Sequence, residues 1–283
     1  MKELLIAQIS DMHIVENNDK NNIQLEKTIK KINDFQPKID LIVATGDLTD
    51  NGLITEYKVL KKILSKAIPD FYLIPGNHDN RENLLSTFYY QKYLYNNFLC
   101  YTLDHLPVIL IFLDTLIEGK PEGEICNDRI SWLSKKLLDY KNKPAIIFLH
   151  HPPFDTGIWW MDAIGLKGRK KLKKLIEKFD NIEAILSGHA HRPILRKWAR
   201  TLGHVAPSTA HQIELDLKGN KFLHINDEPA GFSLHHWTSD NGLTSHICYT
   251  EKSKSYVNSK IKDISKFEEY FKKTQLEFKK NDK

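Results

Sequence analysis

Short apolar runs alternate with helical patterns along most of the chain. The runs end in small or polar residues and read LLIAQIS, DLIVATGD, FYLIPGNHD, VILIFLD, AIIFLHH and EAILSGHAH. Runs of this length, rich in Ile, Leu and Val and without polar alternation, are typical of strands buried on both faces. Between them, the apolar spacing predicts helices over Ile23–Phe35, Leu53–Ala67, Asp128–Tyr140 and Leu166–Phe179. This alternation predicts an α/β fold.

The pattern changes in the C-terminal third. The runs ILRKWA, HVAPST, QIELDL and KFLHIN predict several short, antiparallel strands. From Tyr256 onward, apolar positions such as Ile261, Ile264 and Phe267 fall at helical spacing in a lysine-rich segment. Without a Gly/Ser linker or a repeat, we expect one domain over residues 1–250 and a helical tail over 251–283. The tail is interpreted as a solvated helix face, with a subunit contact in a homodimer as the alternative.

Composition bounds the class of protein. The 283 residues are 41% hydrophobic and 27% charged, which is ordinary for a globular protein. No apolar run approaches the roughly 18–20 residues that a membrane span needs, so no membrane partner is expected. The three cysteines show no C-x-x-C spacing, and MKELLIAQISDMH is a poor signal peptide. We therefore expect a cytoplasmic protein.

The net charge of +5 lies mostly in the tail. Residues 251–283 hold 10 Lys against 6 acidic residues, which leaves the rest of the chain close to neutral. A near-neutral body does not provide the long basic surface that tracks a phosphate backbone. Nucleic acid is therefore not an expected partner.

Candidate chemistry follows the predicted strands, at the edge where open α/β sheets place their sites. The residues are Asp11 and His13, then Asp47, then Asn77, His78 and Asp79, then His150 and His151, and finally His189 and His191. Each fragment alone has an ordinary explanation; Asn77 or Asp79, for example, could cap a helix. Their joint occurrence at five strand ends has no such explanation.

The set contains what a centre of two divalent metal ions needs. Two ions about 3.5–4 Å apart require a bridging oxygen ligand. A carboxylate can bridge where an imidazole or an amide generally does not, so Asp47 is the natural bridge. The amide oxygen of Asn77 and the histidine nitrogens suit Mn, Fe, Zn or Co.

The ordered set D-x-H, G-D, G-N-H-D, H and G-H-x-H resembles that of the calcineurin-like metallophosphoesterases. The resemblance implies a four-layer α/β/β/α sandwich and two groups of metal ligands. One ion would take Asp11, His13, Asp47 and His191, and the other Asp47, Asn77, His150 and His189. His78 would contact the substrate together with Asn77 and protonate the leaving alkoxide. Asp79 would either orient His78 or cap a helix.

A narrower resemblance involves LHHPPFDTGIWWMDAIGL, APSTAHQ and PAGFSLHHW. These stretches are similar to those of class III cyclic nucleotide phosphodiesterases and their glycerophosphodiesterase relatives. Three further residues are candidate substrate contacts: His151, which would either support the neighbouring His150 or contact the substrate, Trp160, which is either in the core or stacked on a nucleobase, and His211. Asn51 stands where protein serine/threonine phosphatases have an Arg, so that branch is disfavoured.

The expected activity is hydrolysis of a small phosphodiester, foremost a 3′,5′-cyclic nucleotide. Within hydrolases, the alternatives are a phosphomonoesterase, a nucleotide pyrophosphatase or a glycerophosphodiesterase with the same centre. From a different class, a non-catalytic metal-stabilised scaffold stays open.

Overall fold

The structure is a computed structural model, and it describes residues 2–17, 20–219, 222–254 and 268–274. The chain divides into two compact units, Met1–Glu251 and Lys252–Lys283. In the second unit, the described part is helical over residues 268–274. The rest of the predicted tail helix lies outside the described residues. None of the described helices is long and apolar enough to cross a membrane.

The first unit contains two mixed sheets, which confirms the predicted α/β class. The first sheet has the order β17-β16-β1-β2-β3, with β1 (Glu3–Ile9), β2 (Leu41–Thr45) and β3 (Asp70–Ile74) parallel, and β16 (Gly231–Thr238) and β17 (Gly242–Tyr249) antiparallel. The second sheet has the order β12-β13-β11-β9-β7-β6. Its strands are β6 (Tyr101–Leu103), β7 (Ile109–Leu113), β9 (Ala145–Leu149), β11 (Ile182–Ser187), β12 (Ile194–Trp198) and β13 (Thr201–Val205).

Helices follow most of the parallel strands. They are α1 (Lys20–Asn33), α2 (Ile54–Leu64), α3 (Arg81–Phe88), α4 (Asn127–Asp139), α5 (Trp159–Ala163) and α6 (Arg169–Ile176). The four predicted helices correspond to α1, α2, α4 and α6. The last of these begins later than predicted, because Leu166–Lys167 forms strand β10 beside β8 (Gly123–Glu124). Shorter elements are η1 (Gln91–Tyr93), β4 (Leu94–Tyr95), β5 (Phe98–Leu99), β14 (Gln212–Ile213) and β15 (Ile225–Asn226).

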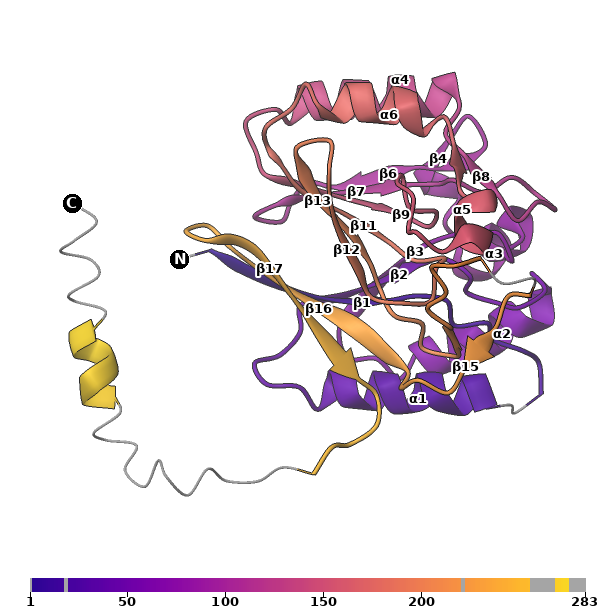
Figure 1. Cartoon of the computed structure of the whole chain (residues 1–283), viewed down its shortest axis with the longest axis horizontal. Coiled ribbons are helices and arrows are strands. Elements are labelled where there is room, and N and C mark those ends of the chain that lie inside the picture. The colour runs from indigo at the N-terminus through magenta and orange to yellow at the C-terminus, as the bar shows by residue number, and fades with distance from the viewer. Residues whose placement is uncertain (1, 18–19, 220–221, 255–267, 275–283) are drawn as a thin grey trace. The chain divides into compact units, whose positions relative to one another are not determined.

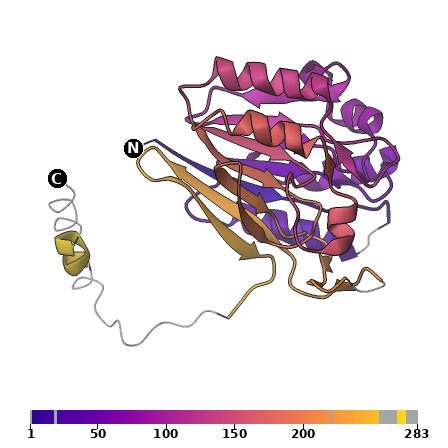
Figure 2. The ribbon, with the colours of Figure 1, turned by 45° about the horizontal axis from the view of Figure 1, so that its top comes forward.

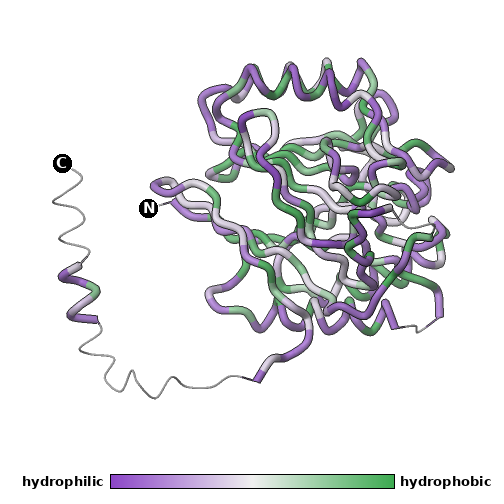
Figure 3. The backbone as a smooth tube through the Cα atoms, viewed as in Figure 1, coloured by the Kyte–Doolittle hydropathy of each residue, from purple (hydrophilic) through white to green (hydrophobic). Residues whose placement is uncertain are grey.

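The two sheets pack face to face, with helices outside both (Figures 1 and 2). Strand β7 shows why: Leu110 and Phe112 join the core shared with the first sheet, whereas Ile109 and Ile111 join the core beneath α4 and α6. Successive strand residues point to opposite faces, so a continuous apolar run serves both cores. The hydropathy of the backbone follows this arrangement, with the apolar stretches in the sheets and polar positions on the outer helices (Figure 3).

Candidate metal centre

The predicted site residues collect where parallel strands of both sheets end. Asp11 and His13 follow β1, Asp47 follows β2, and Asn77 follows β3. His150 follows β9 in the second sheet, and His189 and His191 follow β11. Because the carboxyl ends of parallel strands share one edge, and the sheets face each other, residues far apart in sequence meet here.

Two glycines make the close approach of these loops possible. A Cβ on Gly188 would collide with the Ser10 hydroxyl and lie 2.8 Å from Asp11 Oδ2, and one on Gly76 would collide with the Asp47 backbone nitrogen and carboxylate. Any side chain at either position would therefore push a predicted ligand out of place. This packing therefore requires the glycines that directly precede Asn77 and His189.

Five of the predicted ligands have a left-handed backbone. The φ angles are 52° at Asp11, 44° at His13, 46° at Asp47, 72° at His189 and 49° at His191. Non-glycine residues rarely adopt this region, and such residues cluster at functional sites because the surrounding structure must hold them there. These turns occur where the predicted ligands meet.

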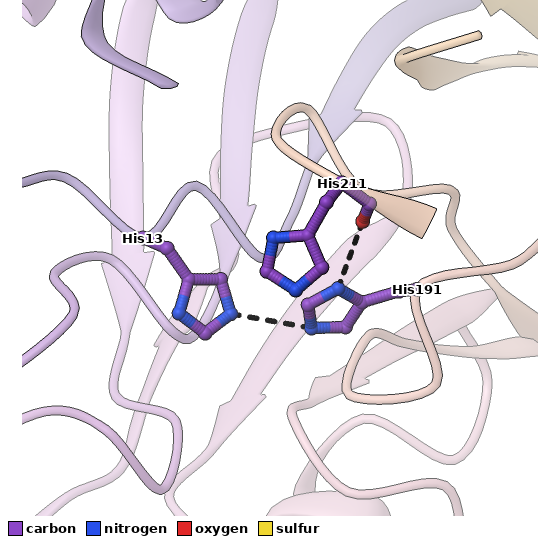
Figure 4. Close-up of side chains that lie close together, drawn as sticks. All are labelled: His13, His191 and His211. Carbon is purple, nitrogen blue, oxygen red and sulfur yellow. Dashed lines mark hydrogen bonds between the residues drawn. The ribbon is translucent and has the colours of Figure 1, made fainter. Parts of the chain in front are cut away.

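The first ligand group comprises Asp11, His13, Asp47 and His191, whose ligand atoms all lie within 4.8 Å of one another. The Nε2 atoms of His13 and His191 are 3.2 Å apart. The Nδ1 of His191 donates to the His211 carbonyl at 2.9 Å (Figure 4). The Nδ1 of His13 donates to Asp50 Oδ1 at 3.0 Å. A neutral imidazole has one N–H, so both Nε2 atoms present lone pairs. The pair needs a proton or a metal cation between them.

The second group is Asn77, His150 and His189, together with Asp47. Asn77 Oδ1 lies 3.1 Å from His150 Nε2 and 2.9 Å from His189 Nδ1. The other nitrogens of these rings are fixed by carbonyls: His150 Nδ1 donates to Thr45 and His189 Nε2 to Ile164. In the neutral form each ring directs an acceptor at Asn77 Oδ1, which is an acceptor itself, whereas a protonated His150 donates to it. This is the ligand orientation that carbonyl partners impose in known metal sites.

Asp47 lies between the two groups. Its Oδ1 is 3.4 Å from His150 Nε2, and its Oδ2 is 3.7 Å from His13 Nε2. Burial raises the pKa of this carboxyl, but the neighbouring His150, with His13 and His78, brings it well below its usual range. Burial likewise lowers the pKa of His150, yet Asp47 raises it to about 9. The charges of the site therefore favour positive charge beside Asp47.

The donor set fits two divalent ions. It has two buried carboxylates, one amide oxygen and four imidazoles, with every imidazole oriented by an acceptor on its outer nitrogen. Mixed O and N ligands of this kind suit Mn, Fe, Zn and Co. The clusters are consistent with a centre of two metals.

His78 is the exposed member of the site. Its Nδ1 donates to the Asp50 carbonyl at 2.8 Å, which leaves Nε2 available to a ligand, and its ring lies 4.6 Å from that of His13. Sequence reasoning missed Asp50, whose carboxylate holds His13 and whose backbone holds His78. The signal was present in GDLTD, where Asp50 follows Asp47 by three residues.

Asp79 does not contact the His78 side chain in the structure. Its carboxylate accepts from the backbone of Leu48, Thr49 and Gly76 and from the Tyr57 hydroxyl. These hydrogen bonds connect the loop that contains Asp47 to the loop that contains Asn77 and His78. Neither Asn77 nor Asp79 caps α3, because that cap is Asn80. The geometry therefore favours a structural role for Asp79 over the expected catalytic one.

His151 is fully buried beneath the second ligand group. Its Nδ1 accepts from the Thr115 hydroxyl at 2.8 Å, its Nε2 donates to the Pro121 carbonyl, and its ring is 4.5 Å from that of His189. With both nitrogens engaged, the ring has no free polar atom for the substrate contact that we expected. Its position favours support of the two ligand histidines.

His211 and Trp160 lie in different surroundings. The His211 ring is 5.2 Å from His13 and 4.7 Å from His191, at the rim of the first group (Figure 4). Trp160 instead lines a small pocket with residues of the β14–β15 segment, among them Glu214 and Leu223. That pocket includes none of the ligand residues, which does not favour the expected stacking of Trp160 on a substrate at the centre.

Comparisons with known proteins agree with this geometry. The family model described as calcineurin-like phosphoesterase matches residues 4–193. The chain is 37% identical over 257 residues to a probable glycerophosphodiester phosphodiesterase GpdQ of Arcobacter nitrofigilis, covering 88% of this chain and 94% of the relative. It is 35% identical to a probable cyclic nucleotide phosphodiesterase of Vesicomyosocius okutanii, covering 73% and 87%. A solved dimetal phosphatase of Danio rerio shares the fold, with a TM-score of 0.66 at 13% identity over 88% of this chain and 99% of that one.

Proposed function

Because the chain belongs to the calcineurin-like phosphoesterase family, we propose that it is a metal-dependent hydrolase of small phosphodiesters. One observation carries the proposal: Asp47 lies between two groups of buried metal-ligand candidates, with one carboxylate oxygen near His13 and the other near His150. The helix–sheet–sheet–helix order supports the family's four-layer sandwich as the catalytic domain of residues 1–250, with 251–283 as an appendage.

In this proposal, Asp11, His13, Asp47 and His191 hold one ion, and Asp47, Asn77, His150 and His189 hold the other. Ions bound by these residues would polarise the phosphoryl oxygens and supply a water of lowered pKa as the nucleophile.

His78 supplies the proton chemistry of the chain itself. Because Nδ1–H is committed to the Asp50 carbonyl, Nε2 is the ring nitrogen left to donate a proton to the leaving alkoxide. His211, at the rim of the first group, contacts the part of the substrate beyond the phosphate.

Glycerophosphodiesters are the substrate class that we favour, with 3′,5′-cyclic nucleotides as the second candidate. The relatives carry both names, and the longer match is to the probable glycerophosphodiester phosphodiesterase. Trp160 lies in a separate pocket. Its position therefore does not support stacking on a nucleobase at the metal centre. A small polar alcohol needs no such stacking.

The test is hydrolysis by metal-stripped protein after addition of Mn²⁺, Zn²⁺ or Co²⁺. Bis(p-nitrophenyl) phosphate, glycerophosphoethanolamine, 3′,5′-cyclic AMP and p-nitrophenyl phosphate are compared under one condition. We expect metal-dependent cleavage of the diesters, with the glycerophosphodiester leading. Preference for the monoester would replace the proposal with a phosphomonoesterase. No cleavage of any substrate by protein with two bound metals would favour the scaffold.

A further inference from the structure

The outer helices α4 and α6 form a cationic face. Together they contain six Lys and two Arg against two Asp. Arg129 is buried and Arg169 pairs with Asp155, so the six lysines supply the cations of this face. The net charge of residues 1–250 is close to zero and does not reveal this local cluster of positive charge, because a sum over the sequence does not show which helices are neighbours. Figures 1 and 2 place both helices side by side as an outermost layer of the first unit.

A groove of about 590 Å³ runs between the two helices. Its apolar lining includes Ile130, Leu138 and Leu175, and Leu138 is 58% exposed. Its cationic lining is Lys135, Lys171, Lys174 and Lys178. Among the described residues, none of these four lysines forms an ion pair. The groove therefore presents unneutralised charge around an apolar strip.

Helices α1 and α2 of the opposite layer are also rich in lysine, and some of these lysines are neutralised locally. Lys27 pairs with Glu251 and Lys30 with Asp34, whereas Lys58 and Lys62 form no ion pair among the described residues. The groove differs because it gathers four unpaired lysines around one exposed leucine.

The cations extend beyond the groove. A second, larger hollow shares Leu138 and Lys178 with it and continues to Lys141 and Lys197. It also includes Arg200, which pairs with Asp180. Charge spread over two helices and the next hairpin suits an extended anionic surface better than a single small anion. A phosphate backbone would leave Leu138 without an apolar partner, whereas a lipid interface accepts lysines and an exposed leucine together.

We propose that the α4–α6 face binds the surface of an anionic lipid membrane. The lysines contact acidic headgroups and Leu138 contacts the acyl boundary, so the protein attaches without a spanning segment. This proposal is independent of the function of the metal centre, and it differs from the expectation of no membrane partner, which concerned spanning segments.

The test is co-sedimentation of the full chain with vesicles at low salt. One set is pure phosphatidylcholine, and the other holds about two parts phosphatidylcholine to one part phosphatidylglycerol. Binding is expected only to the second set, and it should weaken steeply as salt is raised. Lys174→Gln/Lys178→Gln removes two groove cations and should weaken partitioning by roughly 30-fold.

The matched control is Lys58→Gln/Lys62→Gln, which removes the same charge from two exposed positions on α2. We expect it to bind nearly as the unchanged chain does. Equal loss in both variants, or no binding to the anionic vesicles, overturns the proposal. A short DNA duplex is the rival probe, and DNA binding without vesicle binding would assign the face to nucleic acid instead.

Discussion

The Nε2 atoms of His13 and His191 face each other at 3.2 Å, although both outer nitrogens are already donating. Two lone pairs at this separation repel unless a cation lies between them. The folded chain therefore has a built-in need for positive charge at this point, which the unfolded chain lacks.

Metal removal should consequently lower the melting temperature. A ligand held at about 1,000 times its Kd stabilises by about 4 kcal/mol, which corresponds to about 10 °C for a domain of this size. Calorimetry with chelator and after Mn²⁺ or Zn²⁺ is restored measures the shift. Mg²⁺, which avoids nitrogen ligands, is the comparison and should restore little. A melting temperature that is indifferent to chelation would count against the centre.

Asp47→Asn should lose metal as well as activity, because a neutral amide does not bridge two cations. We expect the metal content, measured by elemental analysis after dialysis, to fall from two ions per chain to one or fewer. Asp180→Asn, at an exposed position, is the control and should keep both. Full metal content in Asp47→Asn would show that the ions are held without a bridge.

His78→Ala should retain both metals and lose activity. General acid catalysis contributes about 10²–10⁴-fold, so kcat should fall within that range. The loss should be larger for bis-alkyl substrates than for bis(p-nitrophenyl) phosphate, whose leaving group needs no proton. Equal losses on the two substrates would indicate that His78 positions the substrate rather than protonating it.

Asp50→Ala should weaken one metal site and not the other. The variant removes the acceptor on His13 Nδ1, and loss of such a partner typically costs 10–100-fold in metal affinity. Asp50→Asn keeps an oxygen at the same place and should recover part of the affinity. Competition with a chromogenic chelator resolves the two sites. Equal weakening of both would mean that the loop has been distorted.

Acid should destabilise the fold through His204. Burial lowers the pKa of His204 to about 4 from the ordinary 6.5, so the unfolded chain binds more protons than the folded one between these values. Stability is then present above about pH 6.5 and is lost as pH falls. Between pH 7 and 5 this residue should cost about 2 kcal/mol.

The measurement is urea unfolding at both pH values, in chelator so that metal binding does not contribute. His204→Gln should lose about 2 kcal/mol of the pH dependence, whatever its effect on absolute stability. His105→Gln, at an exposed position, should leave the difference between the two pH values as it was. An unchanged slope in His204→Gln contradicts the explanation.

The clustering of the ligand candidates followed from sequence because it depends on one rule of topology. A polar residue after a doubly buried strand lies at the carboxyl edge of its sheet, whatever the tertiary details. The roles of Asp79 and His151 depended on contacts with Tyr57 and Thr115, which no spacing reveals. The left-handed backbone of five predicted ligands could not be predicted either, because their residue types do not indicate it.

The long hairpin of β16 and β17 escaped the sequence patterns. Strand β16 is almost wholly buried, yet it carries Ser233 and His235 in positions where an apolar run would have marked it. Inside, His235 bonds Gln8 and Ser245, so the polar groups are satisfied. In the sequence, polar residues that form a buried hydrogen-bond network look like the residues of a surface segment, because their partners are not visible there. For this reason the sequence did not predict the pairing of β16 with β1.

The proposed ligands of the centre are spread from Asp11 to His191, and both sheets contribute to each group. During synthesis, a chain that has not yet emerged beyond β11 holds incomplete donor sets, however well its first sheet has formed. In the proposed centre, metal binding would therefore follow the docking of the two sheets, and it would report that the docking is complete.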